Sequence, residues 1–162
     1  STLMRSSAAS DVYKRQEIYQ NKDVFYIGRG IDYAMCLEGS LKLKEVSYTH
    51  SDAYQAGELK HGTISLIEED VPVFAIITDD RIKDKTESNV IEVDSRKAKV
   101  FTITNDDTIK NHHKKYVVPK TSYYLQAILT VPPLQLVGYY VGDLKKLDID
   151  KPRNLAKSVT VE

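Results

Sequence analysis

Three charged residues, Glu38, Lys42 and Glu45, are spaced so that they could act together on one side of a helix. At about 100° per residue, their side chains fall within one narrow stripe. The stripe is flanked on one side by Ala34, Leu37, Leu41 and Tyr48 and on the other by Met35, Gly39 and Val46. We therefore expect a helix packed on two sides. Its stripe is either a set of solvated ion pairs or the wall of a pocket where a carboxylate and an amine move protons.

A second candidate for acid–base chemistry is His61, in the stretch Gly57–Gly62. We expect this stretch to form a polar loop between its two glycines, in which an imidazole could reach a ligand and titrate near neutral pH. A surface histidine without a function fits the same pattern. The pair His112-His113 is expected in a solvated loop, and no metal site is predicted because no spaced carboxylate or third histidine accompanies it.

The elements that must position these residues alternate along the chain. Short apolar runs predict strands, and longer amphipathic stretches predict helices. The expected strands are 23–28, 53–56, 71–78, 99–104 and 115–119, and the expected later helices are 79–96 and two pieces within 121–147. This order predicts an α/β fold with a mainly parallel sheet and helices on both faces.

Two details qualify this pattern. Pro132-Pro133 is expected to separate the two C-terminal helical pieces, because proline lacks the backbone donor and clashes with the preceding turn. Gly28-Arg29-Gly30, after the first strand, lacks the third glycine of a dinucleotide fingerprint, so nucleotide binding is not favoured. No cofactor is predicted.

Length and composition limit the classes of protein to which the chain can belong. With 162 residues, 41% of them hydrophobic, the chain can bury one hydrophobic core. Its 23 basic and 23 acidic residues balance, so no positive electrostatic field favours a nucleic-acid partner. Its single cysteine fits a reducing cytoplasm, and no apolar run is long enough to span a membrane. Residues 1–16 lack periodicity, and residues 6–16 back-translate to a sequence like a transposon-type sequencing adapter. We expect a non-native segment there and a domain at 17–162.

The motifs in their order resemble the glutamine–fructose-6-phosphate aminotransferase (glucosamine-6-phosphate synthase) family. The resemblance rests on residues 37–45, 57–62, a proline before Leu134-Gln135-Leu136, and the C-terminal stretch Asp150–Glu162, which is its most specific part. It implies a three-layer αβα, flavodoxin-like sugar isomerase (SIS) fold, as the second of two such modules. The family makes glucosamine 6-phosphate and glutamate from fructose 6-phosphate and glutamine, the first step of hexosamine synthesis.

The resemblance also implies roles for individual residues. Glu45 would move a proton between C2 and C1 of the sugar, and His61 would open the sugar ring in the neighbouring subunit of a homodimer. Lys157 would contact or form an imine with the open-chain ketose. Lys42 would be catalytic in the same site, and Glu38, Arg153 and Ala156 would bind substrate there.

Some parts of the family pattern are missing from this sequence. The glutaminase domain and the first SIS module, which holds the sugar phosphate, are absent, so we expect the chain alone to be inactive. Lys146 stands where many members have glycine. The alternatives are a stand-alone sugar-phosphate-binding regulatory module, which would not need Glu45, His61 and Lys157 together, and a nucleotide-binding α/β domain.

Overall fold

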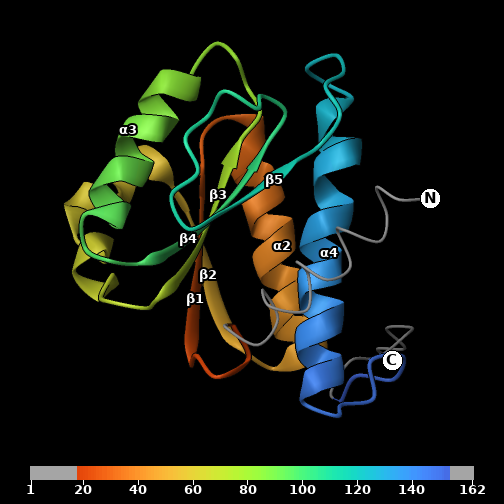
Figure 1. Cartoon of the computed structure of the whole chain (residues 1–162). Coiled ribbons are helices and arrows are strands. Elements are labelled where there is room, and N and C mark those ends of the chain that lie inside the picture. The colour runs from red at the N-terminus through yellow and green to blue at the C-terminus, as the bar shows by residue number, and fades with distance from the viewer. Residues whose placement is uncertain (1–17, 154–162) are drawn as a thin grey trace, which may run out of the picture.

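A five-stranded parallel sheet lies at the centre of the molecule (Figure 1), and the computed structural model describes residues 18–153. The strands are β1 Asp23–Gly28, β2 His50–Gln55, β3 Pro72–Ile77, β4 Lys99–Thr104 and β5 Lys114–Val117. Their order is β2-β1-β3-β4-β5, and each neighbouring pair is parallel. The predicted α/β fold with a parallel sheet is confirmed.

Helices cover both faces of the sheet. On one face lie α2 (Ile31–Ser47) and α4 (Gln126–Leu144), and on the other lie α3 (Lys83–Asp94) and the 3-10 helices η1 (Ala56–His61) and η2 (Thr63–Leu66). Because side chains of a strand alternate between faces, β1 supplies Val24 and Tyr26 to the α2–α4 core and Phe25 and Ile27 to the opposite core. The arrangement gives three layers.

The α2–α4 core contains a row of aromatic rings that crosses the three middle strands. Tyr26 on β1 stacks on Phe74 of β3 with 4.9 Å between ring centroids, and Phe74 stacks on Phe101 of β4 at 5.1 Å. All six residues of β3 are buried, as expected of a strand covered on both faces. These rings form the floor on which α2 and α4 pack.

Helix α2 is packed on the sheet and on α4, but not on both flanks of its charged stripe. Cys36, Ser40 and Leu43 face the sheet and are buried, and Gly39 lies against Leu134 of α4. Leu37 and Leu41, on the other flank, are 48% and 44% exposed. The prediction of packing on two sides of the stripe is therefore wrong for this flank, because the described chain has no element that covers it.

Helix α4 runs without a break through Pro132 and Pro133, so the predicted separation into two pieces is wrong. Tertiary contacts hold the helix on both sides of the prolines. Before them, the buried Gln126 side chain donates to Pro119 O and accepts from Thr121 N and Asn105 Nδ2. After them, Leu134 is buried against α2. These contacts outweigh the loss of two backbone donors.

Two glycines bring the backbone of α4 close to that of α2. A Cβ atom at Gly138 would lie 3.1 Å from Lys42 O, and one at Gly142 would lie 2.8 Å from Val46 O. Just beyond the helix, Lys146 has φ 57°, a left-handed conformation that glycine adopts without steric cost. A glycine at this position would therefore relieve the strain that Lys146 carries.

Other expected boundaries shift by a few residues. Helix α3 begins at Lys83 rather than Asp79, because Asp79 is buried and its carboxylate accepts the Arg81 N–H. The predicted solvated loop at His112-His113 is wrong for His112. The His112 side chain is 1% exposed and its Nδ1 lies 2.8 Å from Asp94 Oδ2, while the His113 ring packs edge-on against Phe101.

We predict that Gly142→Ala destabilises the chain, although alanine normally favours a helix over glycine by about 1 kcal/mol. The new methyl group would overlap the Val46 carbonyl, and such overpacking costs about 1–3 kcal/mol. Urea unfolding of this variant and of Gln135→Ala, an exposed position of the same helix, measures the difference. A Gly142→Ala protein as stable as the parent would show that the helices do not approach so closely.

Candidate functional site

The Glu38–Lys42–Glu45 stripe is a connected set of charges along α2. Lys42 Nζ donates to Glu45 Oε2 at 2.7 Å and lies 3.9 Å from Glu38 Oε1. The three side chains are 32%, 32% and 25% exposed, in sequence order. The stripe is therefore neither fully solvated nor buried, and a ligand can reach its carboxylates from the open flank of α2.

The electrostatics of the stripe hold Lys42 in its cationic form. The hydrogen bond to Glu45 raises the pKa of Lys42, and the nearby charges of Glu45 and Glu38 add to this, while burial opposes it. The charged ammonium group of Lys42 therefore lies within hydrogen-bonding distance of the Glu45 carboxylate. The arrangement is a carboxylate base with a cation that orients it and can neutralise developing negative charge.

His61 lies at the end of η1, where a polar loop was expected. The segment forms a 3-10 helix because Ala56 and Leu59 are buried in the core beneath α3, which pulls the chain into a tight turn. The His61 side chain is 74% exposed, and its Nε2 lies 3.9 Å from Glu58 Oε2. It is therefore free to meet a ligand or another chain from solvent.

The sheet separates His61 from the charged stripe within one chain. Leu59 of η1 packs in the core on the α3 side, whereas Leu43 of α2 packs in the core on the other side (Figure 1). The structure thus brings Glu38, Lys42 and Glu45 together but does not bring His61 to them. A site that used all four residues would need a second chain to supply the imidazole.

The C-terminal stretch is anchored at the end of α2. Arg153 N donates to Tyr48 Oη at 2.7 Å, and the Arg153 guanidinium lies 4.2 Å from the centroid of the Tyr48 ring. Tyr48 is the C-cap residue of α2, three positions after Glu45. Ala156 and Lys157 lie outside the described residues.

A buried polar network at the carboxyl ends of the strands was not found from the sequence. Asp32, in the first turn of α2, is 2% exposed and accepts hydrogen bonds from Thr78 Oγ1, Thr78 N and Asp79 N. Burial raises the pKa of Asp32 despite these bonds. The only available sequence signal was an acidic residue at the start of a helix that follows Gly28-Arg29-Gly30.

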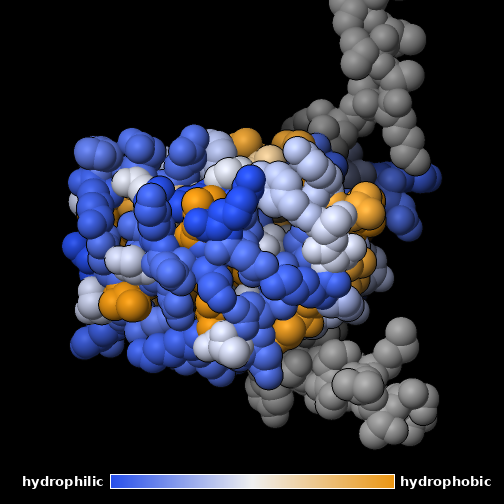
Figure 2. Space-filling view, turned by 90° about the horizontal axis from the view of Figure 1, so that it is seen from above, coloured by the Kyte–Doolittle hydropathy of each residue, from blue (hydrophilic) through white to orange (hydrophobic). Residues whose placement is uncertain are grey.

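This network fills the position where parallel sheets commonly bind nucleotides. After β1 the chain adds β2 on one side of that strand, and then crosses over to add β3 on its other side. The crevice between β1 and β3 is therefore the topological switch point of the sheet. Here Asp32 occupies the backbone donors of Thr78 and Asp79 that a phosphate would need. The carboxyl edge seen from above is mainly hydrophilic (Figure 2), but its central donors are already used.

Two further features concern the class of site. Within residues 18–153, no group of three His, Cys, Asp or Glu side chains is placed to hold a metal ion. The helices of this described part are all too short or too polar to cross a membrane.

Comparison with known proteins defines the class. Residues 17–141 match the sequence pattern of the SIS domain, so the chain belongs to the SIS domain family. It is 52% identical over 149 residues to the glutamine–fructose-6-phosphate aminotransferase (isomerizing) of Caldanaerobacter subterraneus subsp. tengcongensis, covering 90% of this chain and 24% of that protein. It is 53% identical over 148 residues to the enzyme of the same name from Clostridium tetani, covering 89% and 24%.

A solved structure agrees with these relatives. The C-terminal domain of glucosamine-fructose-6-phosphate aminotransferase from Francisella tularensis superposes with a TM-score of 0.83 at 30% identity, over 88% of this chain and 41% of that one. The resemblance found from the motifs is confirmed. The chain spans about a quarter of the length of the curated relatives, in the region of their isomerase domain.

We predict that Asp79→Asn destabilises the chain in a pH-dependent way. The Asp79 carboxylate accepts hydrogen bonds from Arg81, and these bonds lower the pKa of Asp79. The ionised carboxylate therefore stabilises the folded chain above the unfolded-state pKa, and this contribution is lost as the pH falls through the folded-state pKa. Denaturant unfolding should show a loss of about 1–3 kcal/mol at pH 7 that shrinks below about pH 4. Asp107→Asn, an exposed aspartate, serves as control. A loss of unfolding free energy as large below about pH 4 as at pH 7 would contradict this role of the ionised Asp79 carboxylate.

Proposed function

We propose that this chain is the C-terminal sugar-isomerase module of a glutamine–fructose-6-phosphate aminotransferase and moves a proton between C2 and C1 of the bound sugar. The main support for this proposal is the hydrogen bond of 2.7 Å between Lys42 Nζ and Glu45 Oε2 on α2. This pair lies next to the end of the helix where Tyr48 anchors the C-terminal stretch. The substrate would be fructose 6-phosphate, and the whole enzyme would form glucosamine 6-phosphate with ammonia released from glutamine.

Glu45 is the proposed base because a 1,2-proton transfer needs a carboxylate that can take a proton from one carbon and return it to the next. Lys42 holds this carboxylate in position and stays protonated, since the hydrogen bond to Glu45 raises its pKa. Glu38 lies on the far side of Lys42 and fixes the ammonium group from there. It could also bind a sugar hydroxyl.

Lys157 is the proposed carbonyl-activating residue. Lys157 follows Arg153 by four positions, which an extended chain can span over about 14 Å. Glu45 lies about one helical turn from Tyr48, the residue that Arg153 contacts. The Tyr48–Arg153 contact therefore starts the C-terminal stretch close enough for the Lys157 amine to meet a sugar held at Glu45. Ala156 and Arg153 would add contacts to the same substrate.

His61 is proposed to act across a homodimer. It is exposed and lies on the opposite side of the sheet from Glu45, so only a second chain can place its ring in the site. Because an imidazole can both donate and accept a proton, it suits proton transfer during ring opening. The stand-alone regulatory module explains the fold but gives no reason for a 2.7 Å lysine–carboxylate pair on an open helix flank.

The test uses an intact aminotransferase whose C-terminal module is replaced by residues 17–162. Borohydride added with fructose 6-phosphate should trap a reduced adduct on the Lys157 peptide, detected by mass spectrometry. Lys157→Arg should abolish trapping and isomerisation, since arginine stays protonated. Glu45→Gln should lower turnover at least about a hundredfold while fructose 6-phosphate still binds.

Two controls make the result specific. Glu69→Gln, at an exposed position that pairs with Lys97 at 3.4 Å, should leave turnover unchanged. The 162-residue chain alone should form no glucosamine 6-phosphate, because the ammonia source and the phosphate-binding module are missing. Near-normal turnover of Lys157→Arg or Glu45→Gln in the chimaera would refute the proposed roles.

A further inference from the structure

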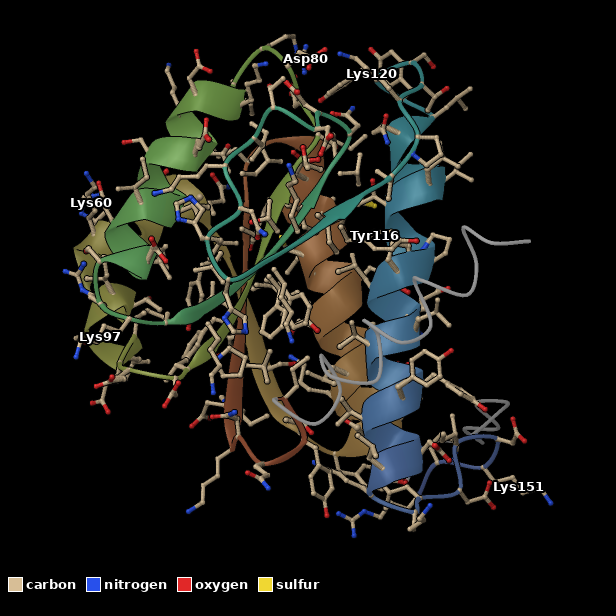
Figure 3. All side chains as sticks on the ribbon, in the orientation of Figure 1. Lys60, Asp80, Lys97, Tyr116, Lys120 and Lys151 are labelled. Carbon is tan, nitrogen blue, oxygen red and sulfur yellow. The ribbon has the colours of Figure 1, made fainter. Side chains whose placement is uncertain are left out.

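A hollow of about 420 Å³ lies between the β1–α2 turn, η1 and α3, on the opposite side of the sheet from the Glu38–Lys42–Glu45 stripe. It is lined by Arg29, Gly57, Lys60, Asp84, Lys85, Ser88 and Asn89. Figure 3 shows Lys60 beside α3, on the side of the molecule away from α4. Three of the lining residues are cations and one is a carboxylate.

The guanidinium group of Arg29 is positioned by neutral partners. Its Nε and Nη2 donate to Asn89 Oδ1 at 3.3 and 2.9 Å, and Asn89 is 4% exposed. The group also lies against the backbone of Gly57, where a Cβ atom would come within 2.7 Å of Nη2. Within residues 18–153, Arg29 forms no ion pair.

A guanidinium held by an amide through Nε and Nη2 has further N–H donors left over. A carboxylate partner would have neutralised the positive charge of Arg29, whereas the neutral amide of Asn89 leaves this charge available to an anionic ligand. Lys85 likewise forms no side-chain hydrogen bond or ion pair in the described part of the chain, whereas Lys60 pairs with Glu92 at 2.6 Å. The hollow is thus a positively charged site in which the Asn89 contact fixes the Arg29 guanidinium, while Arg29 Nη1 donates no hydrogen bond within residues 18–153.

We propose that this hollow binds the phosphate group of a small phosphorylated molecule. A guanidinium group matches phosphate oxygens geometrically, and the unpaired Lys85 at the rim adds a second positive charge that favours a dianion over a monoanion. The volume suits a small ester rather than a macromolecule. Because Lys60 precedes His61 in η1, a bound phosphate would also hold the helix that presents His61. The site itself does not depend on the proposed function.

The experiment titrates the 162-residue chain with inorganic phosphate at constant ionic strength and follows backbone amide shifts by NMR. The signals of Gly57, Lys85 and Ser88 should move together and give one Kd. Arg29→Gln should raise that Kd at least about tenfold, and Lys85→Gln about threefold. A dispersed spectrum and an unchanged melting temperature for Lys85→Gln show that its fold is intact.

Two matched variants distinguish binding of phosphate in the hollow from a general effect of the net charge of the chain. Lys44→Gln removes the same charge from the exposed face of α2 and should change the Kd less than about twofold. Asp84→Asn removes the one carboxylate of the lining and should lower the Kd. Equal effects of Lys44→Gln and Lys85→Gln, or an unchanged Kd for Asp84→Asn, would overturn the proposal.

Two further probes decide what occupies the hollow. Glycerol 3-phosphate should bind at least as tightly as inorganic phosphate, since the hollow has room for its glycerol group, and much weaker binding would contradict the proposal. Light scattering tests a second copy of the chain as occupant. If Arg29→Gln weakens self-association while phosphate moves no lining signal, the hollow is an interface between copies and the proposal fails.

Discussion

The close approach of α4 to α2 is the contact on which the candidate site depends. Gly138 and Gly142 let the backbone of α4 reach the carbonyls of Lys42 and Val46, which places α2 between the sheet and a second helix. The side of α2 that remains open carries Glu38, Lys42 and Glu45, beside the exposed Leu37 and Leu41. A looser crossing would let α2 rotate and would no longer set the exposure of these carboxylates.

The same packing explains how the C-terminal stretch is directed. Lys145, just after α4, donates to Ser47 O and Thr49 Oγ1, and this ties the end of α4 to the end of α2. The chain then turns back so that Arg153 meets Tyr48. Partial burial lowers the pKa of Lys145. This side chain therefore serves as an anchor by hydrogen bonding, at some electrostatic cost.

The parallel sheet divides the functional groups between its two faces. The carboxylates of α2 lie on one side, and His61 with the Arg29 hollow lies on the other. At the carboxyl edge between them, Asp32 closes the switch point from within. The candidate groups thus lie on the flanks of a fold that often binds nucleotides at this edge, and the relatives that share the fold are named as fructose-6-phosphate aminotransferases.

The sequence alone determined the parallel α/β fold and the helix that carries Glu38, Lys42 and Glu45, because strand burial and helical spacing are local patterns. Only the tertiary structure decided that α4 runs through Pro132-Pro133, that His112 is buried and that Leu37 and Leu41 stay exposed. Each of these depends on residues far away in the chain that supply or withhold a packing partner. For the same reason, the Asp32 network and the Arg29–Asn89 contact, which join residues 46 to 60 positions apart, could not be found from spacing.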